Sequence, residues 1–128
     1  MDLVSAAAGI AGLLSLTIQL TQISVNFASK VSNASKAQTE YIRELKALEV
    51  VLDKFKDVAS IPAATIDSYK LQMEKVKAKL EQRLSRNSAL SGLKSFTWPF
   101  EEADMLRVME MLHRLQSILH SSVSVEGL

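Results

Sequence analysis

The first predicted helix has apolar residues on almost all of its sides. This helix runs from about residue 2 to about residue 30, and residues 3 to 29 carry no charge. The uncharged stretch would be about 40 Å long as a helix, which exceeds the roughly 30 Å of a bilayer core. A helix that is apolar all round lies either at the centre of a bundle or in a membrane. The pattern leaves both places open.

Three later stretches repeat apolar residues at steps of three and four, the spacing of a helix with one buried face. The second predicted helix runs from about 34 to 58 and ends before Pro62. The third runs from about 63 to 86. The fourth follows Thr97, a candidate cap, and Pro99, which is acceptable in a first turn. The apolar positions are Tyr41, Leu45, Leu48, Leu52, Phe55 and Ala59, then Ile66, Tyr69, Met73, Val76, Leu80 and Leu84, then Met105, Val108, Leu112, Leu115 and Leu119.

Composition favours an all-α fold. Aromatic residues make up 5% of the 128 residues, and only two prolines and four glycines interrupt the pattern. We predict a helical bundle of about four long helices with a mostly apolar N-terminal helix. The apolar residues between the third and fourth helices are predicted to fold back onto the core: Leu90, Leu93, Phe96 and Trp98.

Small residues recur at every fourth position of the first predicted helix. One row is Ser5, Gly9 and Leu13, and another contains Ala8 and Gly12. Such rows let two helices approach closely, in membranes as in soluble bundles. We predict that this helix packs tightly in the resting fold and that it enters a membrane in another state.

Charge is unevenly distributed, although the formal net charge is only +1. Residues 60 to 94 hold seven bases and three acids, whereas residues 95 to 128 hold two bases and five acids. The contrast predicts that these segments pair with each other, or that a basic face meets an anionic surface. A lysine run is more often a plain solvated face, and no aromatic is interleaved to suggest nucleic acid. The bases predicted to contact anionic lipid are Lys70, Lys75, Lys77, Lys79 and Arg83.

Residues suited to catalysis or metal binding are missing or unsuitably spaced. The chain has no cysteine, which excludes disulfides and thiolate chemistry. His113 and His120 are seven residues apart on one helix, whereas a metal pair prefers a spacing of four. Gly9 and Gly12 are not followed by the lysine of a phosphate-binding loop. We therefore predict that the protein is not an enzyme, needs no cofactor or metal, and binds neither a small-molecule substrate nor nucleic acid.

Three stretches together resemble the fungal HeLo-like domains, the N-terminal domains of many STAND (NLR-type) receptors and of related cell-death proteins. They are MDLVSAAAGIAGLLSLTIQLTQISVNF, YIRELKALEVVLDKF and LKSFTWPFEEADMLRVMEMLHRLQSILHSSVS. The resemblance covers essentially the whole chain and consists of apolar patterning plus the turn Trp98-Pro99-Phe100. It implies a single HeLo-like helical bundle domain over residues 1–128, excised from a longer protein.

The resemblance also implies a role in programmed cell death during fungal self/non-self recognition. Activated members oligomerise and permeabilise the plasma membrane, with the N-terminal helix as the suspected membrane-active part. The domain would be cytoplasmic at rest, with anionic lipids and further copies of itself as partners once activated. The alternative is a non-toxic protein-interaction and signalling domain of such a receptor. The residues predicted to insert are Leu3, Val4, Gly9, Ile10, Gly12, Leu13, Leu14, Leu16, Ile18 and Leu20.

Overall fold

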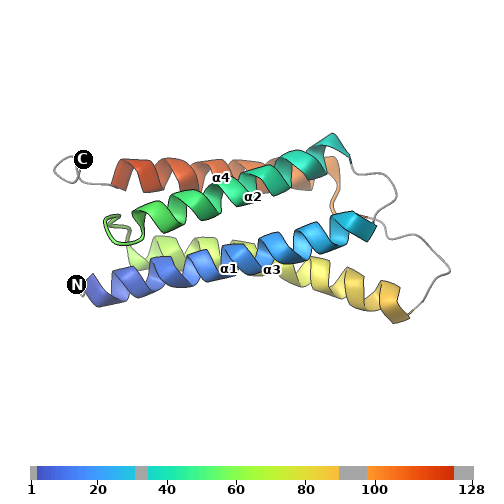
Figure 1. Cartoon of the computed structure of the whole chain (residues 1–128), viewed down its shortest axis with the longest axis horizontal. Helices are drawn as coiled ribbons and strands as arrows, with labels where there is room; N and C mark the ends of the chain where they lie inside the picture. Colours follow the sequence, from blue (N-terminus) through green and yellow to red (C-terminus); the bar gives the residue numbers. More distant parts are fainter. Residues whose placement is uncertain (1–2, 31–34, 90–97, 123–128) are drawn as a thin grey trace.

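The described part of the chain is a bundle of four α-helices (Figure 1). The computed structural model describes residues 3–30, 35–89 and 98–122, and it describes side chains for residues 9–30, 35–85 and 98–122. The helices are α1 (Leu3–Lys30), α2 (Lys36–Phe55), α3 (Ala63–Ala89) and α4 (Glu102–Ser122). The predicted all-α bundle with an apolar N-terminal helix is confirmed.

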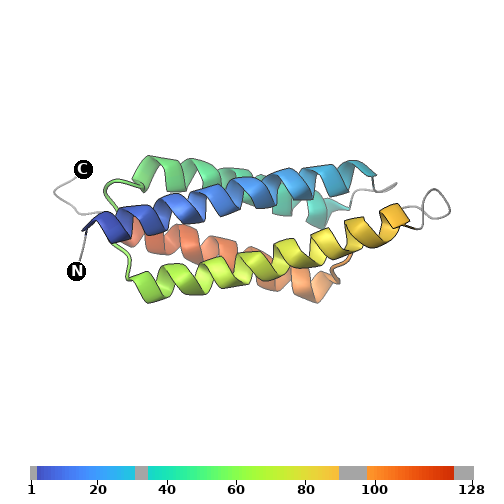
Figure 2. The ribbon, with the colours of Figure 1, turned by 90° about the horizontal axis from the view of Figure 1, so that it is seen from below.

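Each helix runs opposite to the one before it (Figures 1 and 2). Helix α1 packs against α2 and α3, and α2 also packs against α4. The connection from α2 to α3 therefore crosses the end of the bundle diagonally. There the backbone N–H of Ser60 donates to the carbonyl of Ser122, 3.4 Å away, which joins this connection to the end of α4.

The ends of α1, α2 and α3 differ from the predicted bounds by three residues or fewer, for local reasons. Ser35 caps α2, because its hydroxyl accepts a hydrogen bond from the backbone N–H of Gln38 at 3.2 Å. Helix α2 ends at Phe55 rather than 58, where the next residues form a turn that bonds back to the Phe55 carbonyl. Helix α3 continues to Ala89, beyond the predicted end at 86.

The start of α4 corrects the predicted role of Pro99. The carbonyl of Glu101 accepts the first helical hydrogen bond, from the N–H of Met105 at 3.0 Å, so Glu101 precedes the first turn. The carboxylate of Asp104 accepts in return from the N–H of Glu101 at 3.4 Å, as in a capping box. Pro99 thus lies before the helix rather than in its first turn. Thr97, the predicted cap, lies outside the described residues.

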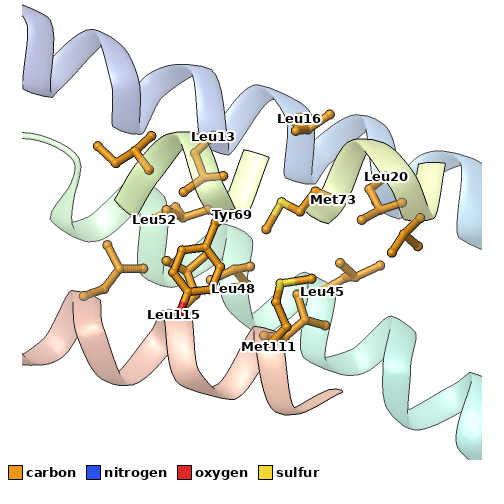
Figure 3. Close-up of a cluster of buried hydrophobic side chains, with 14 of the residues drawn as sticks. Leu13, Leu16, Leu20, Leu45, Leu48, Leu52, Tyr69, Met73, Met111 and Leu115 are labelled. Carbon is orange, nitrogen blue, oxygen red and sulfur yellow. The ribbon is translucent and has the colours of Figure 1, made fainter. Parts of the chain in front are cut away.

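The core lies along the axis of the bundle and is lined by the predicted apolar positions (Figure 3). Ala59, Leu84 and Val108 are half-buried at its edge, and the other predicted positions of α2, α3 and α4 are buried. Trp98 folds back as predicted, with its ring centroid 5.4 Å from that of Phe27. Leu90, Leu93 and Phe96 lie outside the described residues. Helix α1 contributes Ile10, Leu13, Leu16, Leu20 and Phe27.

Candidate functional site: the first helix and the bases of the third

Helix α1 places one side in the core and the other toward solvent. Four residues of the predicted membrane-insertion set are buried: Ile10, Leu13, Leu16 and Leu20. Full burial of one such side chain stabilises the fold by about 1.5–3 kcal/mol. Leu14 is half-buried and Ile18 is 37% exposed, whereas the side chains of Leu3 and Val4 lie outside the described set. Insertion of these residues into a bilayer would therefore require α1 to leave the bundle.

The two glycines of α1 lie in close contact with α3, as the small-residue rows predict. A Cβ atom added at Gly9 would lie 3.2 Å from Cδ1 of the buried Ile66. A Cβ added at Gly12 would lie 2.8 Å from Nζ of Lys70, the far end of a flexible side chain. The two positions therefore differ, because Ile66 is held in the core while the Lys70 ammonium group can move.

Among the described side chains of α1, residues 9–30, three hydroxyl groups are buried, and two of them bond within their own helix. Thr17 donates to the carbonyl of Leu13 at 2.7 Å, and Thr21 donates to the carbonyl of Thr17 at 2.8 Å. The Ser24 hydroxyl instead pairs with the hydroxyl of Tyr41 on α2, at 2.8 Å. Burial raises the pKa of the Tyr41 phenol, and the bond to Ser24 offsets only part of that rise. Departure of α1 would leave the bonds of Thr17 and Thr21 to their own helix intact. It would break the Ser24 bond and the 3.5 Å contact of Thr17 Oγ1 with the sulfur of Met73 on α3.

The outward side of α1 is an uncharged stripe that sequence patterning did not isolate. Its exposed members recur at steps of four and three: Ala11, Ser15, Ile18, Gln22, Val25 and Ser29. The helix carries apolar or uncharged polar residues on every side, so the sequence offered no charged face to mark which side meets solvent. The consequence is that no charge would have to enter the hydrocarbon region with this side of the helix.

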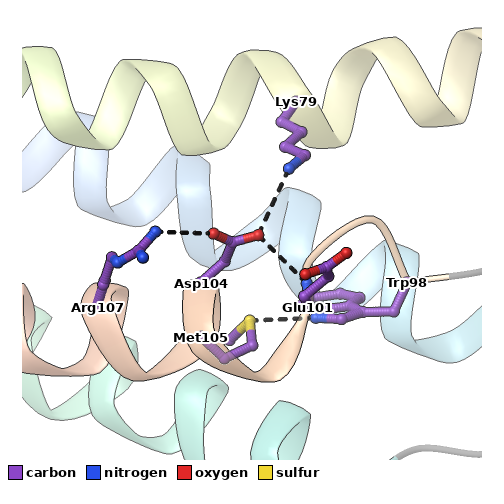
Figure 4. A network of polar contacts seen from close by, with 6 residues as sticks. All are labelled: Lys79, Trp98, Glu101, Asp104, Met105 and Arg107. Carbon is purple, nitrogen blue, oxygen red and sulfur yellow. Dashed lines mark hydrogen bonds and ion pairs between the residues drawn. The ribbon is translucent and has the colours of Figure 1, made fainter.

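An aromatic cluster holds the C-terminal half of α1. The Trp98 ring lies edge-on to Phe27 and 5.9 Å from Tyr41. Its other neighbours are Phe100, at 5.7 Å, and the sulfur of Met105, to which the indole N–H donates at 3.2 Å (Figure 4). The turn that carries Trp98 is thereby attached to three helices, α1, α2 and α4.

The five bases predicted to contact lipid do not share one face of α3. Lys70 and Lys77 face α1, where the Lys77 ammonium donates to the amide oxygen of Gln19 at 2.8 Å. Lys79 faces α4, with its nitrogen 3.9 Å from Asp104 and 5.0 Å from the Phe100 ring (Figure 4). Lys75 is exposed and Arg83 is half-buried. Among the described residues, the predicted pairing between the basic and acidic segments is made by Lys79 and Asp104.

A groove of about 430 Å³ lies between α1 and α3, with Gly12 in its wall. Two bases and two acids alternate along its α3 side: Lys70, Glu74, Lys77 and Glu81. This mixed lining gives no net attraction for an anionic headgroup, so the groove does not strengthen the predicted lipid contact.

Both histidines of α4 lie against α2. His113 Nε2 is 2.9 Å from a carboxylate oxygen of Glu44, to which Gln116 also donates at 3.1 Å. The ring of His120 lies edge-on to Phe55 at 5.2 Å. Within the ranges that the structure describes, no cluster of three or more His, Asp or Glu residues could hold a metal ion.

Comparison of the chain with family models, curated proteins and solved structures gave no match. Among the described residues, one helical segment is long and apolar enough to cross a membrane, Gly9–Lys30 of α1. The core helix of a soluble protein meets the same criterion, and the buried side of α1 fits that description as well.

Proposed function

We propose that this protein is a membrane-targeting cell-death execution domain that oligomerises and permeabilises the plasma membrane through α1. The observation that carries the proposal is the absence of charge over residues 3 to 29, on the buried and the exposed sides of the helix alike. An ordinary bundle helix has a charged outer side, as α2 does. The resemblance of the opening residues to HeLo-like domains adds the biological setting.

The internal hydrogen bonds of α1 support the same proposal. Thr17 and Thr21 satisfy their hydroxyls on the helix's own backbone, so neither would carry an unpaired donor into lipid. Apolar side chains that move from a protein core to a lipid environment lose little hydrophobic stabilisation. The main cost of release is the core left open in the other three helices, which oligomerisation on the membrane would have to offset.

The alternative is a protein-interaction domain whose first helix never leaves the core. The fit of Gly9 against Ile66 and the burial of Leu13 and Leu20 favour this alternative, because both belong to a well-packed resting bundle. On this hypothesis the uncharged outer side of α1 would contact protein rather than lipid.

Dye release from anionic liposomes distinguishes the membrane-permeabilising domain from the protein-interaction domain. The full chain is tested both as purified and clustered on an oligomeric scaffold, and we expect release at least in the clustered form. The variant Ile18→Lys/Gln22→Lys places charges on the exposed side of α1, where the resting fold tolerates them. In the bilayer centre each lysine costs about 2.5–3.5 kcal/mol. Added lysines do not weaken electrostatic docking to anionic lipid. A loss of dye release by this variant would therefore show that α1 must insert into the bilayer for release to occur.

The matched control is Leu71→Lys/Gln82→Lys, which makes the same two kinds of change at exposed positions of α3. This control should release dye as the unchanged chain does. No release from the clustered chain, or equal release by the α1 variant, would contradict the proposal and favour the interaction domain.

A further inference from the structure

Val50 and Leu106 are the two most exposed large apolar side chains of the described residues. Val50 on α2 is 67% exposed and Leu106 on α4 is 60% exposed. Isolated exposed apolar residues are common on protein surfaces. These two stand out because of the charges beside them.

Each of the two residues lies midway between two like charges, one helical turn away on either side. Val50 lies between Lys46 and Lys54, which together form the basic line. Leu106 lies between Glu102 and Glu110, which together form the acidic line. Residues four apart on a helix are neighbours on its surface, so each line is continuous. The two lines therefore have the same spacing and opposite charge.

The four charged side chains are exposed, and none forms an ion pair within the described parts of the chain. Lys54 lies over the ring of its neighbour Phe55, with the nitrogen 5.4 Å from the ring centroid, and its charge still faces solvent. The nearby acid Asp53 is bonded to Lys56 instead. Both lines thus present unneutralised charge outward.

The acidic line also forms one wall of a groove of about 470 Å³ between α2 and α4. Met105 and Met109 contribute apolar surface to the groove. On the α2 side Glu40 adds a third carboxylate and Lys36 a single base, so acids outnumber lysines in the lining by three to one. Methionine side chains are flexible and adapt to different apolar partners. The groove therefore suits an apolar side chain that is flanked by bases.

We propose that the acidic line of one copy binds the basic line of a second copy, with Val50 seated in the groove beside Leu106. The partner is a second copy because the chain itself carries the complementary line, at matching spacing and on an outward face. Opposite charges that flank an apolar contact set register and partner choice, as at coiled-coil edges. The contact is small, so its affinity is weak and falls as salt rises.

Each contact joins two different surfaces, the basic line of one copy and the acidic line of the other. The basic line lies in the last turns of α2 and the acidic line in the first turns of α4. Two copies that pair both lines at once form a closed dimer, whereas copies that pair one line each leave the other free and can extend into a ring or an open chain. This inference deepens the oligomerisation in the proposed function, but it uses only the resting fold with α1 in place. Its failure would therefore be distinguishable from a failure of membrane permeabilisation.

Sedimentation equilibrium of the full chain, without lipid, tests the contact at low and high salt. The average mass should rise with protein concentration at low salt, and this rise should disappear at high salt. Lys46→Glu/Lys54→Glu and Glu102→Lys/Glu110→Lys should each abolish it. An equal mixture of the two variants should restore association, because each copy then meets an oppositely charged line. Reversal of both charges in a line makes the result independent of whether the lines run parallel or antiparallel.

The control Ser68→Glu/Lys75→Glu/Ser85→Glu changes the net charge as much as the first variant, at exposed positions of α3. It should associate as the unchanged chain does. Val50→Ser, which alters no charge, should weaken association several-fold. Three results would each overturn the proposal: a chain that stays monomeric at low salt, a mixture that fails to associate, or a control that loses association like the reversed lines.

Discussion

The hydroxyls of Ser24 on α1 and Tyr41 on α2 lie 2.8 Å apart, and both residues are fully buried. This pair is a buried polar contact between α1 and α2. Removal of a single hydroxyl group from this pair should therefore weaken the attachment of α1 to α2.

Removal of one partner should cost more than removal of both. Ser24→Ala leaves the Tyr41 hydroxyl buried without a partner, which typically costs about 1–3 kcal/mol. The double variant Ser24→Ala/Tyr41→Phe removes both polar groups and should recover most of that loss. Urea denaturation measures the free energy of unfolding of each variant. A double variant as unstable as the sum of its two single variants would contradict a direct bond.

Alkaline pH should destabilise the fold through Tyr41. Burial raises the folded-state pKa of its phenol above the ordinary value of 10.0, and the unfolded chain ionises at that ordinary value. The stability contributed by the neutral buried phenol is therefore fully present below pH 10.0 and declines as the pH rises above it. Tyr41→Phe should flatten that decline. Melting temperatures of the unchanged chain and of Tyr41→Phe between pH 8 and 11 test this. Lysine titration affects both proteins alike, so the difference between them reports Tyr41.

Bulk at Gly9 should be less tolerated than bulk at Gly12. Gly9→Leu forces side-chain atoms against the buried Ile66, and overpacking of this kind typically costs about 1–3 kcal/mol. Gly12→Leu displaces the movable end of Lys70 and should cost less. Gly12→Ala should be neutral or stabilising, because alanine favours a helix by up to about 1 kcal/mol over glycine. Thermal unfolding followed by circular dichroism ranks the three variants.

Fluorescence of Trp98 should report whether α1 leaves the bundle. This residue is the only tryptophan of the chain, and its ring lies against Phe27 of α1. Release of α1 would expose the indole to water and shift its emission to longer wavelength. We expect that shift with anionic vesicles under conditions that cause dye release, and no shift for Ile18→Lys/Gln22→Lys. Dye release without any spectral change would mean that the C-terminal half of α1 stays in place.

Individual lysines of α3 should contribute unequally to lipid binding. Lys75→Gln removes an exposed charge with no ion pair among the described residues, so it should lower vesicle binding without lowering the melting temperature. Lys79→Gln also breaks the contacts with Asp104 and Phe100, so it should slightly lower both vesicle binding and the melting temperature. Vesicle co-sedimentation at two salt concentrations compares them. Equal binding by Lys75→Gln and the unchanged chain would argue against docking through α3.

The sequence by itself determined the number of helices, the bounds of α1, α2 and α3 to within three residues, and the buried side of α2, α3 and α4. These features are local, because an apolar stripe at helical spacing marks the side that must avoid water whichever neighbour covers it. The close contacts of Gly9 and Gly12 followed in the same way, since a row of small residues allows close approach to any partner.

Only the tertiary structure decided which helices are neighbours, and from that which side chains meet. Lys70 and Lys79 both lie off the apolar stripe of α3, yet one faces α1 and the other faces α4. Spacing along one helix cannot separate those two sides until the neighbouring helices are placed. The outward stripe of α1 and the bond between Ser24 and Tyr41 depended on the same arrangement. Residues 3 to 29 of α1 carry no charge, so the packing of the neighbouring helices is the physical reason that one side faces the core and the other faces water.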